Sequence, residues 1–337
     1  MDNWNTDQLV ADDKRYVWHP FTSMGEWCAP NHEPIVLVSG EGAILRDSRG
    51  REYIDGNASI WTNVHGHNHP RINAAIREQL ERVAHTSFLG TTNPVAIELA
   101  REIVGLLPKE KFGRVFFSDD GSTAMEAALR IVSQHWKLKG SKRQTFISFR
   151  DGYHGDTAGA ASLGATAMFG GELGGFRFPV RQVGRIDELQ GLESPDKVAA
   201  VIIEPIVQGA AGMKIWPAGT LRRLRDWCDE TGTYLIADEV MTGFGRTGTM
   251  FACEHEAVAP DIYVFGKGLT GGYLPLALTV IANQIFEPFG TEKPDSILFY
   301  GHSYTGNALG CAAALASLQI FREDETIRLL SPKIEAL

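Results

Sequence analysis

The chain has 337 residues, of which 44% are hydrophobic and 22% charged, as in an ordinary globular protein. Its formal net charge of −9 argues against a nucleic-acid-binding surface, which would be basic. No apolar run approaches the roughly 18 residues that span a membrane, and the N-terminus shows no signal pattern. The four cysteines are scattered without a C-x-x-C pair, so we expect free thiols and a cytoplasmic location.

Over about the first 60 residues, the sequence predicts short strands and turns. The expected strands cover residues 35–38, 43–46 and 52–54, with glycines between them. A helix is predicted from Pro70 to about His85. A second helix is predicted to follow, with Asn93 as its cap and Pro94 at its first position.

A regular alternation of strands and helices then begins. Apolar runs predict strands at 114–118, 144–149, 199–203, 234–237, 262–265 and 277–281. Helices are predicted at 122–138 and 218–230, so the pattern indicates an α/β fold with a mostly parallel sheet covered on both faces. Ligands of such sheets bind beyond the carboxyl ends of the strands, which is where chemistry is expected.

The first strand end of interest runs Ser-Asp-Asp-Gly-Ser-Thr over residues 118–123 and opens a helix. Gly121 allows close backbone approach, and Ser122 with the free N–H groups of the first turn predicts an anion site. A plain helix cap is the structural alternative.

The second strand end carries Asp238 and Glu239. A buried Asp that faces a pyridine nitrogen would keep this nitrogen protonated and make the ring an electron sink. An ion pair or a Mg²⁺ site would also explain two carboxylates at this position.

The third strand end carries Lys267, which is flanked by glycines directly after an apolar strand. Desolvation there would lower its pKa and make the amine a nucleophile, although a lysine that only snorkels from the strand end fits as well. The motif G-x-x-x-x-G-K-[ST] is absent, which argues against a nucleotide phosphate loop and a Mg²⁺-dependent phosphotransferase.

Two further segments extend the pattern. Glu204 ends a strand, where it either supports a neighbouring group or belongs to a structural turn. Tyr153 lies between glycines and could stack on a planar cofactor. A phosphate cradle, an acid for a pyridine nitrogen and a poised lysine thus follow one another along one α/β unit, and this set is more specific than its members.

These motifs resemble the class III aminotransferases of fold type I, which use pyridoxal 5′-phosphate (PLP). The resemblance covers nearly the whole chain and is carried by WHPFTSM at 18–24, WTNVHGHNHP at 61–70, GYHGDT at 152–157, DEV at 238–240, TGFGRTG at 242–248 and GKGLTGG at 266–272. The opening WHPFTSM resembles the branch that converts 8-amino-7-oxononanoate to 7,8-diaminononanoate in biotin biosynthesis.

The resemblance implies a role for each site residue. Gly121 and Ser122 bind the cofactor phosphate, Tyr153 stacks near the ring, Asp238 pairs with the pyridine nitrogen, and Lys267 holds the cofactor as a Schiff base. The substrate is expected to contact Phe21, Ile60, Trp61, Tyr153 and Gly301. The segment GHSYTGN at 301–307, with His302 and Ser303, reaches the phosphate of a partner subunit, which implies a homodimer with shared active sites.

The resemblance also divides the chain into three segments. Residues 1–62 are expected to contribute to a small domain and the substrate site, 63–305 to form the large PLP-binding domain, and 306–337 to start a truncated C-terminal domain. That last domain normally supplies an arginine for the substrate carboxylate, and no residue here takes this role. The stretch between Gly164 and Ala199 is also shorter than usual for the family.

Two residues bear on the amino donor. Members that use S-adenosylmethionine commonly carry Tyr in place of Phe21 and Trp in place of Ile60, and the pattern here resembles the branch that uses lysine. Another ω-aminotransferase activity is one alternative, and a truncated, catalytically weak chain that binds PLP is another. Alternating histidines at 65, 67 and 69 could bind a metal ion, but the family uses this segment structurally, so no metal site is expected.

Overall fold

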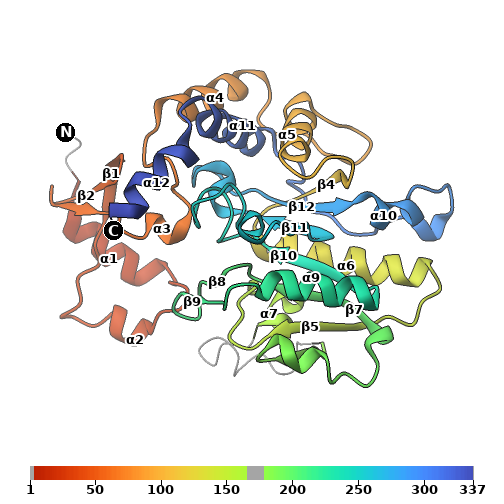
Figure 1. Cartoon of the computed structure of the whole chain (residues 1–337). Coiled ribbons are helices and arrows are strands. Elements are labelled where there is room, and N and C mark those ends of the chain that lie inside the picture. Colours follow the sequence, from red (N-terminus) through yellow and green to blue (C-terminus); the bar gives the residue numbers. More distant parts are fainter. Residues whose placement is uncertain (1–3, 165–177, 337) are drawn as a thin grey trace.

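The computed structural model of the protein describes residues 4–164 and 178–336. A seven-stranded sheet forms its centre (Figure 1). In the order in which they pair, its strands are β4 (Phe112–Ser118), β12 (Ala277–Ala282), β11 (Ile262–Phe265), β10 (Tyr234–Asp238), β7 (Val198–Ile203), β5 (Thr145–Phe149) and β6 (Arg181–Val183). β12 is antiparallel to both of its neighbours, and the other pairs are parallel. The predicted α/β fold with a mostly parallel sheet is therefore confirmed.

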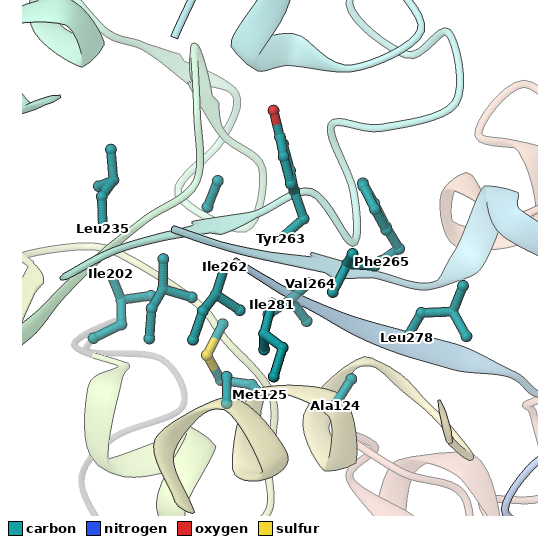
Figure 2. Close-up of a cluster of buried hydrophobic side chains, with 14 of the residues drawn as sticks. Ala124, Met125, Ile202, Leu235, Ile262, Tyr263, Val264, Phe265, Leu278 and Ile281 are labelled. Carbon is teal, nitrogen blue, oxygen red and sulfur yellow. The ribbon is translucent and has the colours of Figure 1, made fainter. Parts of the chain in front are cut away.

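The central strands are apolar on both faces because both faces are covered. Every residue of β7, β10, β11 and β12 is buried. Figure 2 shows Ile262 and Val264 pointing towards Met125, whereas Tyr263 and Phe265 point to the opposite face. This alternation is the period of two that a strand imposes on its side chains.

Helices lie on both faces of this sheet (Figure 1). They are α4 (Pro70–Arg82), α5 (Pro94–Gly105), α6 (Gly121–Leu138), α7 (Ala158–Leu163), α9 (Thr220–Thr231), α10 (Asn283–Phe286) and α11 (Ala308–Glu323). The last helix, α12 (Thr326–Ala336), follows α11 and lies near Gly245 and Gly248. α11 packs on α4 and α5, and its small side chains are buried around most of its circumference. The division at residues 62 and 305 stays a prediction.

Of the predictions for the N-terminal part, one is confirmed and one is wrong. A small antiparallel sheet of β1 (Leu37–Glu41), β2 (Ile44–Asp47) and β3 (Glu52–Ile54) forms close to the expected positions. The expectation of only strands and turns is wrong for α1 (Thr6–Tyr16), which the Asn5 side chain caps. This helix is mostly polar, so it lacks the apolar period that signals a helix in a sequence.

Short elements complete the description. They are α2 (Met24–Trp27), α3 (Ala58–Trp61), the strands β8 (Val207–Gln208) and β9 (Lys214–Ile215), and the 3₁₀ turns η2 (Ile186–Leu189), η3 (Pro195–Lys197), η4 (Ala252–Glu256), η5 (Lys267–Thr270), η6 (Glu287–Phe289) and η7 (Pro294–Ser296). Of the stretch between Gly164 and Ala199, residues 165–177 lie outside the described part. Within 4–164 and 178–336, no helix is both long and apolar enough to cross a membrane.

Candidate active site

A cavity of about 750 Å³ lies beyond the carboxyl ends of β4, β5, β7, β10 and β11. Eight of the predicted site residues line it: Phe21, Ile60, Trp61, Gly121, Ser122, Tyr153, Asp238 and Lys267. The sheet brings most of them together because parallel strands present their carboxyl ends at one edge. Leu276 joins them from the start of β12, which is antiparallel and therefore begins at the same edge.

Lys267 is the first residue after the Gly266 that follows β11. Its backbone φ is +42°, a left-handed value that non-glycine residues adopt at a cost of about 1–3 kcal/mol. Burial lowers the pKa of its amine, and Asp238 and Glu204 partly oppose this change. The ammonium nitrogen lies 4.8 Å from the centre of the Trp61 ring. Lys267 is thus a sheltered amine with an increased neutral fraction.

Asp238, at the end of β10, is buried and forms the acidic side of the cavity. One carboxylate oxygen accepts from the Val240 N–H at 3.1 Å, and the other lies 2.6 Å from Nδ1 of His154. Burial alone would lower the pKa of His154, but the hydrogen bond and charge of Asp238 outweigh it, so the pKa is raised. The protonated imidazole is therefore the form that the buried carboxylate favours.

Glu204 follows β7 and lies behind Tyr153. Its carboxylate accepts from the N–H groups of Tyr153 at 3.1 Å and Gly209 at 3.0 Å. Burial, reinforced by the charge of Asp238, raises the pKa of Glu204 to about 7. Glu204 therefore supports the loop that carries Tyr153 and His154, as the supporting interpretation of this strand end predicts.

The predicted anion site falls at the N-terminus of α6. Asp120 and Thr123 form a reciprocal capping box, while the N–H groups of Gly121 and Ser122 have no partner within the helix because they belong to its first turn. A Cβ at Gly121 would lie 2.7 Å from a methyl group of Val240, so this position requires glycine. The helix dipole adds to the attraction for an anion.

The opposite side of the cavity is aromatic and apolar. The Tyr153 hydroxyl donates to Asp156 at 2.6 Å, and Phe21, Ile60 and Trp61 form a wall that faces Lys267. All three wall residues have left-handed φ values, of +52°, +64° and +66° respectively. The carbonyl of Trp61 accepts from Arg246 at 3.2 Å.

Gly301, His302 and Ser303 do not line this cavity in the described chain. Nδ1 of His302 lies 3.9 Å from an oxygen of Asp119, and the carbonyl of Ser303 lies 2.7 Å from Nε2 of His85. Their assignment to the site of a partner subunit stays a prediction.

The rings of His65 and His67 make hydrogen bonds with polar groups of the chain. Nε2 of His65 lies 3.1 Å from the Ser317 hydroxyl, and burial lowers the pKa of His65 to about 4. His67 lies between Asp55 and Asn63. Among the described residues there is no group of three or more His, Cys, Asp or Glu side chains arranged for a metal ion.

Sequence reasoning did not single out several residues of the cavity. His154 belongs to a quoted motif, but its partner Asp238 is 84 positions away and no local pattern reveals the pair. Thr62, Asp119, Val240 and Met241 also line the cavity, each within three positions of Trp61, Gly121 or Asp238. Proximity along the chain to a predicted site residue is the signal that could have found them.

Comparisons with known proteins agree with this geometry. The family model described as "Aminotransferase class-III" matches residues 27–336. An adenosylmethionine-8-amino-7-oxononanoate aminotransferase from Nitratidesulfovibrio vulgaris is 46% identical over 98% of this chain, which spans only 65% of that relative's length. A protein of the same name from Geobacter sulfurreducens is 42% identical over 100% of this chain and 79% of its own.

Solved structures give the same picture. The crystal structure of an adenosylmethionine-8-amino-7-oxononanoate aminotransferase from Methanocaldococcus jannaschii superposes with a TM-score of 0.95 at 38% identity, over 98% of this chain and 78% of that one. An amine transaminase from an uncultivated Pseudomonas species, solved in its PLP-bound form, has a TM-score of 0.86 at 33% identity, over 92% and 75% of the two chains. The fold is therefore shared over nearly the whole chain.

Proposed function

Because the chain belongs to the class III aminotransferases, we propose that it is a PLP enzyme that transfers an amino group to 8-amino-7-oxononanoate and forms 7,8-diaminononanoate. One observation carries the proposal. The Lys267 amine and the Asp238 carboxylate come from the adjacent strand ends of β11 and β10 and face one cavity. The names of the relatives at 46% and 42% identity supply the substrate.

The residues present fit the cofactor. Its phosphate suits the first turn of α6, where a Cβ at Gly121 would collide with Val240. A protonated ring nitrogen suits Asp238, a buried carboxylate at the cavity that His154 and the Val240 N–H contact from behind. A covalent bond to the carbonyl carbon suits Lys267, since burial lowers the pKa of its amine.

When bound, PLP supplies an electron sink for the negative charge that develops on the carbon bearing the amine. Asp238 would hold the proton on the ring nitrogen, and His154, 2.6 Å from its other side, would orient the carboxylate. In the first half of the reaction the free Lys267 amine would accept the proton from the donor carbon at Nζ and pass it to the cofactor, and in the second half it would move a proton the opposite way, to the carbon of the acceptor. Phe21, Ile60 and Trp61 line the cavity and would contact the substrate.

The amino donor is proposed to be lysine or S-adenosylmethionine. Phe21 and Ile60 line the cavity, and they stand where members that use S-adenosylmethionine commonly carry Tyr and Trp, which supports lysine. Parallel assays with the two donors decide between them. Robust turnover with S-adenosylmethionine and none with lysine would reject the lysine assignment.

The activity is tested by the ultraviolet-visible spectrum of the PLP-loaded protein. The wild type is expected to show a visible band from the Lys267–cofactor bond, and 7,8-diaminononanoate should abolish it. Lys267→Ala removes the amine, so the band should be absent and turnover should fall by about a thousandfold or more. Lys139→Ala, an exposed lysine at the end of α6, is the matched control.

Each outcome separates the candidates. Loss of the band with other amines, but not with 7,8-diaminononanoate, would point to a different ω-aminotransferase. A stable band that no amine alters would identify a PLP-binding chain with little catalysis. We also propose a cytoplasmic homodimer, supported by four free cysteines and by the position of His302 and Ser303 outside their own chain's cavity.

A further inference from the structure

Segment α3 (Ala58–Trp61) has an unusual backbone. All four of its residues carry a side chain, yet their φ values are +50°, +50°, +64° and +66°. At Ser59 and Ile60 the ψ values are 51° and 54°, which places them in the left-handed helical region. L-residues avoid this region because Cβ approaches the following carbonyl oxygen, so consecutive residues remain there only when the surroundings impose it.

The left-handed turn forms part of the wall of the active cavity. Ile60 and Trp61 line the cavity, and the Trp61 ring covers the Lys267 amine at 4.8 Å from its centre. If Ser59 and Ile60 relaxed to ordinary φ values, the path of the chain would change at the wall itself. The position of the substrate-side wall therefore depends on whatever holds the turn.

One carboxylate holds the start of the turn. Asp55 accepts from the Ser59 N–H at 2.9 Å with one oxygen and from the Ser59 hydroxyl at 2.8 Å with the other. The Asp55 side chain is only 9% exposed, which strengthens these bonds. The second oxygen also lies 2.8 Å from Nε2 of His67, and Nδ1 of that ring lies 2.9 Å from the Asn63 amide nitrogen.

We propose that Asp55, oriented by His67, is a positioning residue that holds α3 in its left-handed form and thereby sets the substrate-side wall at Ile60 and Trp61. Asp55 does not line the cavity itself. Its effect on the reaction is exerted through the turn and should appear in substrate binding more than in the chemical steps. This inference rests on the proposed function only in assigning the cavity to a substrate.

The test compares Asp55→Ala with the double variant Asp55→Ala/Ser59→Gly. The loss of both bonds to Ser59 should raise the KM for the amino donor about tenfold, with a smaller change in kcat. Glycine adopts left-handed φ values without steric cost, so Ser59→Gly should restore most of the lost KM. A merely structural role would give no such rescue at one backbone position.

A second readout needs neither cofactor nor activity. The labelling rate of Lys267 by an amine-acylating reagent, measured by mass spectrometry on the cofactor-free protein, reports how well Trp61 covers the amine. We expect Asp55→Ala to increase this rate about fivefold, and Ser59→Gly to reverse the increase. The labelling rate can be measured even if the protein turns over none of the substrates tested.

The matched control is Asp47→Ala. Asp47 is also buried in the N-terminal part, where it accepts hydrogen bonds from Arg51 and Tyr53 and does not line the cavity. Asp47→Ala should lower the midpoint of thermal unfolding but leave both the KM for the amino donor and the labelling rate of Lys267 unchanged. Equal effects of the two Asp variants, or no rescue by Ser59→Gly, would overturn the proposal. If Asp55→Ala does not fold, Asp55→Asn, which keeps one acceptor oxygen, is measured in the same way.

Discussion

Two titratable groups lie close to the Asp238 carboxylate, the imidazole of His154 and the carboxyl of Glu204, and burial shifts the pKa of each. His154 has a raised pKa because its bond to Asp238 outweighs burial, and Glu204 has a pKa raised to about 7 chiefly by burial. At both neighbours of Asp238 the pKa shift thus favours the protonated form. Both shifts reduce the negative charge around the carboxylate that a ring nitrogen would contact.

The Glu204 pKa gives a pH-dependent prediction. The folded chain binds this proton more tightly than the unfolded chain, in which the pKa is near 4.5. The contribution of Glu204 to the free energy of unfolding is therefore largest below about pH 4.5 and is lost as the pH rises through about 7. For the cofactor-free protein we expect a loss of about 1–3 kcal/mol over this range, and Glu204→Gln should abolish it.

Thermal unfolding between about pH 5 and about pH 8 measures this effect. Glu193→Gln, at an exposed position, is the matched control and should keep the wild-type pH dependence. Identical pH curves for Glu204→Gln and the wild type would show that Glu204 is ionised in the folded protein throughout this range.

At the scale of elements, the site depends on where strands end and helices begin. β4 ends at Ser118, and α6 begins at Gly121 behind a capping box. Val240, two residues after the end of β10, packs against Gly121, so two elements distant in sequence fix the distance between the predicted anion site and the acidic residue. The start of α6 cannot shift without moving one side of the cavity.

Gly121→Ala tests this contact. The added methyl group would lie 2.7 Å from Val240, so the first turn of α6 must move away from the cavity. We expect affinity for PLP to fall about tenfold, which corresponds to about 1.4 kcal/mol, in a spectroscopic titration. Gly105→Ala in α5 adds a methyl group in open space and should bind PLP as the wild type does. Unchanged affinity in Gly121→Ala would mean that the phosphate binds elsewhere.

For the whole molecule, the main unexplained feature of the site is the segment 301–307. His302 and Ser303 belong to the chain segment just before α11, outside the cavity of their own chain. Under the proposed homodimer these residues complete the site of the other subunit. Each active site would then combine Lys267 of one chain with Ser303 of the other.

Mixed dimers test this arrangement. Lys267→Ala chains and His302→Ala/Ser303→Ala chains should each be nearly inactive as homodimers. Refolded together, they should regain activity in about a quarter of all sites, because half of the dimers are mixed and each mixed dimer holds one intact site. No recovery, in a mixture that sedimentation shows to be dimeric, would place both sets of residues in one subunit's site.

The sequence by itself determined the alternation of elements and the residues at the strand ends, because both depend on local patterns. Apolar runs place the ends of β4, β10 and β11 within about two residues, and the residues that follow include Gly121 and Lys267. Asp238, the last residue of β10, was found in the same way. The polar helix α1 was missed because it has no apolar period.

Only the tertiary structure decided which side chains meet and which backbone conformations are imposed. The pair of His154 and Asp238 joins positions 84 residues apart, and the contact of Trp61 with Lys267 joins the N-terminal part to the large sheet. The left-handed turn at Ala58–Trp61 opposes the intrinsic preference of every residue in it. Local preferences determine the helices and strands. Contacts between distant parts of the chain determine the cavity wall at Ile60 and Trp61, the pairing of His154 with Asp238 and the burial of the Lys267 amine.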